Sequence, residues 1–156
     1  MNQAIRGFYQ ITQTIKEQLL QDVNVKTVTT GDITDIDLSK QTILPLAHLM
    51  INNVSLQEQV MTFNVSILFM DIVDVSKDQT TDLFVGNNNE HDVLNTQLAV
   101  ANKLVQVLRM GTLYKDKYQL EADANCEPFY DRFENQLAGW AVTFDVLISN
   151  DIDICS

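Results

Sequence analysis

The chain has 156 residues, of which 21 are acidic and 10 are basic, so its formal net charge at pH 7 is −11. This balance argues against a domain that grips nucleic acid, because phosphate binding needs clustered lysines and arginines. It is compatible with an acidic surface that DNA passes without sticking, and equally with a charge that serves solubility alone.

A single domain spanning residues 1–156 is expected at this length. The sequence contains no apolar run of about 18 residues, so no membrane span is predicted. The first 20 residues lack the unbroken apolar stretch of a signal peptide, and we expect a soluble protein folded in a cytoplasm. Cys126 and Cys155 are too few for a disulfide framework. Free buried thiols are expected, although the spacing also permits a disulfide between them.

The N-terminal segment has the period of an amphipathic helix of about five turns. Apolar positions recur at steps of three and four, and polar residues fill the others. The residues predicted to share the apolar face are Ile5, Phe8, Thr12, Ile15 and Leu19.

Residues 25–38 have the pattern of a β-hairpin. Residues 25–30 are rich in β-branched side chains, Gly31-Asp32 is a turn signal, and residues 33–38 alternate apolar with polar. Polar residues outnumber apolar ones, so the ribbon can hardly bury both faces in its own core. We expect an arm or edge that a neighbouring chain covers. The candidate contact residues in it are Thr27, Thr29, Asp32 and Thr34.

The next strand should begin at Pro45 or lie at an edge there, because proline cannot donate to a ladder. His48 lies among apolar neighbours in this strand. It is either a metal ligand or base, or a satisfied core or edge histidine. The second interpretation is preferred, because no other His or Cys lies at ligand spacing.

Residues 61–72 form the most regular strand pattern. One face is apolar throughout and is predicted to face the core. Its residues are Met61, Phe63, Val65, Ile67 and Phe69. The opposite face begins polar and becomes apolar at Leu68, Met70 and Ile72. Such a change favours contact with a helix or another subunit, so these three residues are candidate interface residues.

A polar loop leads from this strand into the next helix. Its apolar residues Leu83, Phe84 and Val85 should pack against something, and we count them as candidate contacts with a partner. Asn88 or Asn89 is the expected helix cap, followed by acidic residues in the first turn. The same stretch lacks the alternating aspartates and fixed glycine of a calcium loop, so capping is preferred to metal binding.

Residues 91–110 are predicted to form the second helix, with Arg109 in the last turn and Gly111 after it. Its apolar arc is broad, which predicts cover on more than one side. One stripe consists of Leu94, Leu98, Ala101, Val105 and Leu108, and Val93, Val100, Leu104 and Val107 widen it.

The last third has the pattern of strands, in residues 113–123 and 125–148. Gly139 is predicted to permit a turn or bulge that starts the final strand, so that Trp140 anchors the core under the helices. Val142, Phe144, Val146 and Ile148 share the face of Trp140. Residues 149–156 form an acidic tail that either adds a short edge or stays disordered.

The predicted fold class is therefore α+β. Consecutive strands favour antiparallel pairing, and two amphipathic helices need an apolar surface to cover. We expect an antiparallel β-sheet with two amphipathic helices packed on one face and a projecting β-hairpin.

The sequence contains none of the patterns GxSxG, HExxH, GxGxxG or GxxxxGK[ST]. A Cys–His dyad is possible in principle, because only the fold sets the distance between such residues. Acidic residues gather at Asp71 and Asp74 and within residues 32–37. Carboxylate pairs can bind a metal or transfer protons, but at strand ends and turns they are more often solvated. We predict no catalysis, no cofactor and no metal site.

The organisation resembles the tail-terminator and tail-completion proteins of tailed bacteriophages, a family of small α+β proteins that form rings. The resemblance covers nearly the whole chain. It rests on the N-terminal helix, the hairpin leading into DLSKQTILPLAHLMINN, the strand VMTFNVSILFMDIVD, the helix DVLNTQLAVANKLVQVLR and the closing RFENQLAGWAVTFDVLI. These are patterns of residue type and order rather than an invariant motif.

This resemblance implies a homo-oligomeric ring of six or twelve copies, at the head-proximal end of the tail or in the neck of the virion. Such a ring terminates or joins the tail, contacts tail tube and neck or connector proteins, and lets DNA pass without binding it specifically. It implies assembly in the host cytoplasm and no catalysis, cofactor or membrane. The alternatives are a small monomeric or dimeric binding or adaptor domain, and a metal-dependent enzyme.

Overall fold

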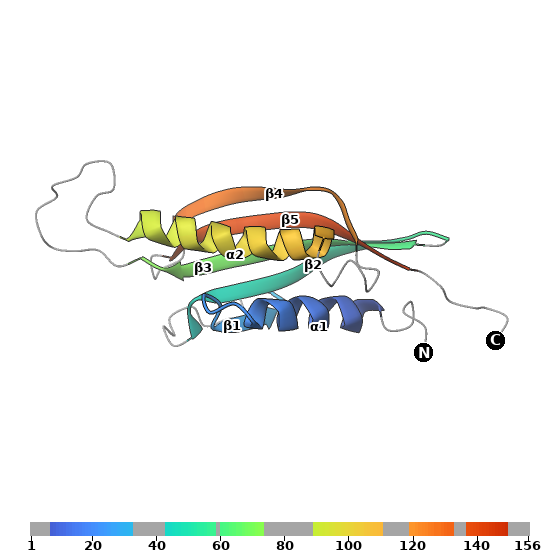
Figure 1. Ribbon diagram of the computed structural model, residues 1–156, viewed down its shortest axis with the longest axis horizontal. Coiled ribbons are helices and arrows are strands. Elements are labelled where there is room, and N and C mark those ends of the chain that lie inside the picture. Colours follow the sequence, from blue (N-terminus) through green and yellow to red (C-terminus); the bar gives the residue numbers. More distant parts are fainter. Residues whose placement is uncertain are drawn as a thin grey trace, which may run out of the picture.

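A computed structural model describes residues 7–32, 43–58, 60–73, 89–110, 119–132 and 137–149. Over these residues the chain forms two helices and one five-stranded sheet (Figure 1). The elements are α1 (Gly7–Leu20), β1 (Thr27–Thr30), β2 (Leu46–Leu56), β3 (Val60–Ile72), α2 (Glu90–Met110), β4 (Gln119–Arg132) and β5 (Leu137–Ser149). The predicted α+β class is confirmed.

The strand order in the sheet is β1-β2-β3-β5-β4. β3 pairs antiparallel with β2 and β5, and β5 pairs antiparallel with β4. β1 pairs parallel with β2, which corrects the expectation of antiparallel pairing throughout. A parallel pair needs a connection of about a dozen residues or more, and residues 31–45 are long enough to supply it.

The first strand of the predicted hairpin arm does not project from the sheet. β1 lies along β2, and the amides of Lys26 and Thr27 donate to the Pro45 carbonyl at 2.9 and 3.3 Å. Val28 packs against the main core. The expected second strand of the hairpin, residues 33–38, lies outside the described residues.

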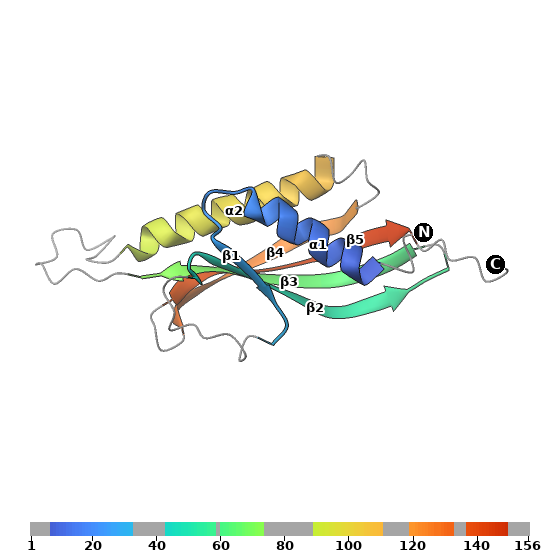
Figure 2. The same ribbon diagram turned by 90° about the horizontal axis from the view of Figure 1, so that it is seen from below.

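The main core lies between the helices and one face of the sheet. α2 contacts β3, β4 and β5, whereas α1 contacts β1 and α2 (Figures 1 and 2). On the sheet side the core is built by the alternating face of β3 and β5, as predicted for these strands. Its buried residues there are Phe63, Val65, Ile67, Phe69, Val142, Phe144, Val146 and Ile148.

The buried face of α1 includes the predicted Ile15 and Leu19 but not Phe8, and Ile5 lies outside the described residues. Gly7, Ile11, Ile15 and Leu19 are buried, and Phe8 is 53% exposed. A step of four residues keeps these positions on one side of the helix. Gly7 faces the side chain of Ile148, where a Cβ would come within 3.0 Å of a methyl group. The missing side chain therefore lets the start of α1 approach the sheet closely.

A second, smaller apolar cluster covers the other face of the sheet at one end. It contains Leu44, Leu46, Met70, Phe129 and Leu137, with Leu68 and Ile72 packed against it. The late apolar residues of β3 are therefore in contact with apolar residues of the same chain. Met70 is fully buried, so its side chain is not on an exposed interface surface.

Gly139 does not begin β5 with a turn. It lies inside the strand opposite Met70, and a Cβ on it would overlap the carbonyl oxygen of Phe69. Its role is a close approach of two backbones. Trp140 follows it, is partly buried, and donates from Nε1 to the carbonyl of Leu94 in α2 at 2.8 Å. The tryptophan thus ties α2 to the sheet.

The structure extends β4 across the predicted strand break. β4 runs from Gln119 to Arg132, with register shifts against β5 between Glu121 and Asn125 and between Phe129 and Arg132. At the start of α2, the amide of Val93 donates to the Asn89 carbonyl at 2.9 Å, which agrees with the predicted cap. Neither α1 nor α2 is long and apolar enough to cross a membrane.

Candidate functional site

A groove of about 460 Å³ lies between α2 and the edge strand β4. Its apolar lining comes from Leu98, Ala99 and Val105 of α2 and from Ala124 and Cys126 of β4. Polar side chains of α2 complete the walls. It is larger than the cavity of about 160 Å³ that α1 and β1 line together with Leu49.

Leu98 is 38% exposed in this groove, although its spacing placed it on the predicted buried stripe. Ala101, Val105 and Leu108 of the predicted stripe are buried, as are Val100 and Leu104, which were predicted to widen it. Leu98 lies on a flank of the helix that faces β4 rather than the middle of the sheet. The apolar arc of α2 is therefore broad because it includes Leu98, which lines an open groove.

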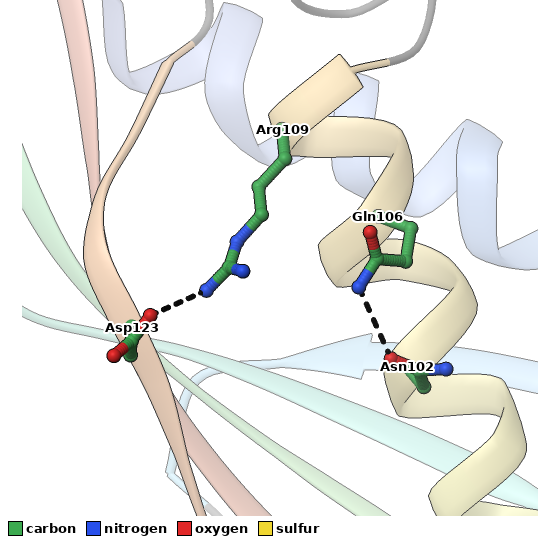
Figure 3. Close-up of polar contacts among 4 residues, drawn as sticks. All are labelled: Asn102, Gln106, Arg109 and Asp123. Atoms are coloured by element: carbon green, nitrogen blue, oxygen red, sulfur yellow. Dashed lines mark hydrogen bonds and ion pairs between the residues drawn. The ribbon is translucent and has the colours of Figure 1, made fainter.

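An ion pair marks one end of the groove. Arg109 Nη2 and Asp123 Oδ1 are 2.9 Å apart, joining the last turn of α2 to β4 (Figure 3). The Asp123 side chain is 96% exposed, so solvent screens the pair and its contribution to stability is small. One turn earlier, Gln106 donates to the Asn102 side chain at 3.4 Å. Arg109 is the one charged residue among the described residues that line the groove, and Asp123 at the rim offsets its charge.

Cys126 is a free, partly buried thiol in the floor of the groove. Burial raises the pKa of this thiol above its ordinary value, so the reactive thiolate is scarce at neutral pH. It does not meet His48. Their strands are separated by β3 and β5, and three strand spacings amount to about 14 Å.

His48 is fully buried and both of its ring nitrogens have partners. Nε2 lies 2.7 Å from the carbonyl oxygen of Gly31, and Nδ1 lies 2.8 Å from the hydroxyl of Thr29. A carbonyl can only accept, so Nε2 donates to Gly31, and Nδ1 shares a hydrogen bond with the Thr29 hydroxyl. The interpretation as a satisfied core histidine is confirmed, and the residue fastens β1 to β2.

The other predicted interface residues are placed as follows. Thr27 and Thr29 are half-buried in β1, and the hydroxyl of Thr29 already bonds to His48. Asp32 is exposed, and Leu68 and Ile72 are half-buried against the smaller cluster. Thr34, Leu83, Phe84 and Val85 lie outside the described residues, as do Asp35, Asp37 and Asp74.

An exposed stripe on α1 was not anticipated from the sequence. Tyr9 is 67% exposed and its ring packs edge-to-face on Phe8, with centroids 6.3 Å apart and an interplanar angle of 77°. Gln13, Lys16 and Leu20 follow on the same side at helical spacing and are also exposed. We call Phe8, Tyr9, Gln13, Lys16 and Leu20 the α1 stripe. The spacing of Gly7, Ile11, Ile15 and Leu19 would have revealed it.

The sheet face opposite the helices carries a hydrogen-bonded polar row. Asn52 donates to Asn64 and to Ser66 at 2.8 and 2.7 Å. Asn64 in turn donates to Asp145 at 2.7 Å, and Ser66 lies 3.1 Å from the Thr143 hydroxyl. Asn52 sits at the register shift between β2 and β3, which brings its side chain to this face. The row joins side chains of β2, β3 and β5 on this polar face, which includes the carboxylate of Asp145.

No group of three His, Cys, Asp or Glu residues within the described ranges is close enough to hold a metal ion. A scan of known protein families finds no model that matches the chain, and a search of curated proteins finds no matching relative.

Proposed function

We propose that this protein is a structural subunit of a homo-oligomeric ring at the head-proximal end of a phage tail or in the neck. The proposal begins from the sequence resemblance to tail-terminator and tail-completion proteins. The observation that carries it further is the presence of two exposed apolar surfaces, the α1 stripe and the α2–β4 groove, on different sides of one domain.

The two surfaces are separated by α2. Leu19 and Asp22 at the end of α1 face Val100 and Lys103 on one flank of α2, whereas Leu98 lies on the opposite flank, toward β4. Figure 1 shows α2 between α1 and β4. A self-contact that joins two unlike surfaces is heterologous, and such contacts produce rings or filaments rather than closed dimers.

The acidity of the chain supports passage of DNA. On the polar face of the sheet, Asp145 is joined to Asn64, and Glu127 of β4 is exposed on the same side. Carboxylates repel phosphate, so a lumen wall of this kind leaves DNA mobile. The ring would terminate or join the tail without binding any particular DNA sequence.

Native mass spectrometry and negative-stain imaging of the purified chain test the proposal, alone and together with tail tube and connector proteins. A closed ring of six or twelve copies is the expected species in at least one of these samples. A protein that stays monomeric in all of them contradicts the proposal.

The groove also favours a second candidate, an adaptor domain that binds a helix of another protein as a monomer or dimer. Helix-in-groove recognition uses an apolar trough of this type. Light scattering separates the two functions, because an adaptor stays monomeric or dimeric with its ligand bound.

A further inference from the structure

We infer that neighbouring copies of this chain contact each other by inserting the α1 stripe of one copy into the α2–β4 groove of the next. The inference rests on the proposed ring and specifies the contact that builds it. The occupant is a second copy because the two halves of the contact are on one chain and are matched in length, polarity and charge.

The lengths agree. From Asn95 to Arg109 the groove follows α2 for roughly 21 Å, at 1.5 Å per residue. From Tyr9 to Leu20 the α1 stripe extends for roughly 17 Å on the same rise. A helix that lies in a groove uses anchors at steps of three, four and seven, which is the spacing of Tyr9, Gln13, Lys16 and Leu20.

The polarities agree as well. Phe8, Tyr9 and Leu20 are the exposed apolar residues of the stripe, and Leu98 and Val105 line the groove that receives them. Tyrosine is enriched at the energetic centres of interfaces because it buries a large area and keeps a polar tip. The edge-to-face contact with Phe8 holds the Tyr9 ring in place before association.

Charge restricts where two such copies can touch. Each carries a net charge of −11, so association is least opposed where the local charge is neutral or positive. Arg109 in the groove is paired with Asp123 at its rim, and Lys16 of the stripe lies next to the exposed Glu17, so both surfaces are close to neutral. Asp123 is almost wholly exposed at the groove rim, where a lysine of the incoming helix can join it.

Strand addition at β4, the edge of the sheet formed by the described residues, is a poorer way to join copies. Two register shifts interrupt β4, and Pro128 between them removes a backbone donor. Both features discourage edge-to-edge pairing. The side of β4 that remains usable is the one that faces α2 across the groove.

Two single variants test the contact, Tyr9→Glu on the stripe and Leu98→Glu in the groove. Both side chains are partly exposed, so the fold should tolerate the replacements, and thermal unfolding checks this. Each variant should weaken self-association about tenfold or more relative to the parent protein, measured by sedimentation velocity. Leu56→Glu is the matched control, because Leu56 is an exposed leucine outside both surfaces, and it should assemble normally.

Mixing the two variants gives the sharper result. The Leu98→Glu chain keeps an intact stripe and the Tyr9→Glu chain keeps an intact groove, so one functional contact can form between them. Native mass spectrometry should detect a one-to-one heterodimer that does not extend. A contact that joined stripe to stripe or groove to groove would instead leave one of the two single variants able to assemble.

The possible outcomes are distinguishable. If the parent chain forms rings and either single variant still forms them, the inferred contact is wrong but the proposed ring is not contradicted. The same conclusion follows if the parent chain forms rings and the mixture forms no heterodimer. Equal loss of assembly in the Leu56→Glu control would also overturn it, because added charge alone would then explain the effect. A parent chain that never assembles, even with tube and connector proteins, overturns the contact and the ring together.

Discussion

At the scale of single residues, two positions hold the sheet together in ways that side-chain type alone does not reveal. Gly139 allows β5 to approach the backbone of β3 at Phe69, and His48 fastens the edge strand β1 through two hydrogen bonds. Both act on backbone placement rather than on chemistry with a ligand. Each therefore predicts a loss of stability, and not of an activity, when it is replaced.

Gly139→Ala should destabilise the protein by about 3 kcal/mol or more, beyond the common range for overpacking. The added Cβ meets the carbonyl of Phe69 and the Cα of Met70, and neither backbone atom can move without disturbing the sheet. Urea unfolding measures the change. Gly7→Ala is the control, because its Cβ meets only the flexible side-chain ends of Ile148 and Met61, and alanine favours a helix. Equal costs for the two replacements would contradict this account.

His48→Leu should cost about 2–3 kcal/mol, because it leaves the Gly31 carbonyl and the Thr29 hydroxyl without their partner. Thr29→Val removes one of the two hydrogen bonds and should cost about 1 kcal/mol. Chemical unfolding of both single variants and the double variant provides the measurement. The double variant should lose less than the two single losses combined, since the residues share a bond. Strict additivity would show that the two side chains act independently.

At the scale of elements, regular patterns were predicted well and pairings were not. β3 and β5 alternate without interruption, so period alone identifies their core faces, and both strands are central. The parallel pairing of β1 was missed because Gly31-Asp32 is a local turn signal, whereas the choice of a partner strand is tertiary. The prediction placed a strand break inside β4, because register shifts interrupt the alternation of its side chains.

The candidate surfaces were harder to predict than the elements. The groove is formed by Leu98 and Cys126, which belong to elements that no local pattern brings together. The α1 stripe depends on helix phase, and an apolar Phe8 suggests burial unless Gly7 is recognised as the inward residue. The face of β3 that becomes apolar at Leu68, Met70 and Ile72 does make apolar contacts, but its partners include Leu44 and Leu46 of the same chain.

Trp140 joins two elements and gives a prediction at this scale. Trp140→Phe keeps the ring but removes the hydrogen bond to Leu94, and should cost about 1 kcal/mol. Trp140→Ala also removes the packing between β5 and α2, and should cost about 3–5 kcal/mol. Thermal unfolding of both variants measures the difference. An unchanged midpoint for Trp140→Ala would mean that the side chain does not anchor α2.

At the scale of the whole molecule, the distribution of charge determines how copies approach one another. A chain of net charge −11 repels its own copies at long range, while the contact inferred for α1 and the groove is mostly apolar. Attraction is therefore short-ranged and repulsion is long-ranged. These two contributions respond differently to salt.

Assembly of the proposed ring should strengthen when salt is raised from about 10 mM to about 150 mM, because the Debye length falls from about 30 Å to about 8 Å. Screening then weakens the repulsion between copies and leaves the burial of Tyr9 and Leu98 unaffected. Sedimentation velocity across a salt series measures the fraction of assembled protein. The Leu98→Glu variant should stay unassembled throughout, which separates a specific contact from general aggregation. An assembled fraction that falls with salt would instead mean that ion pairs between copies, rather than this apolar contact, hold the ring together.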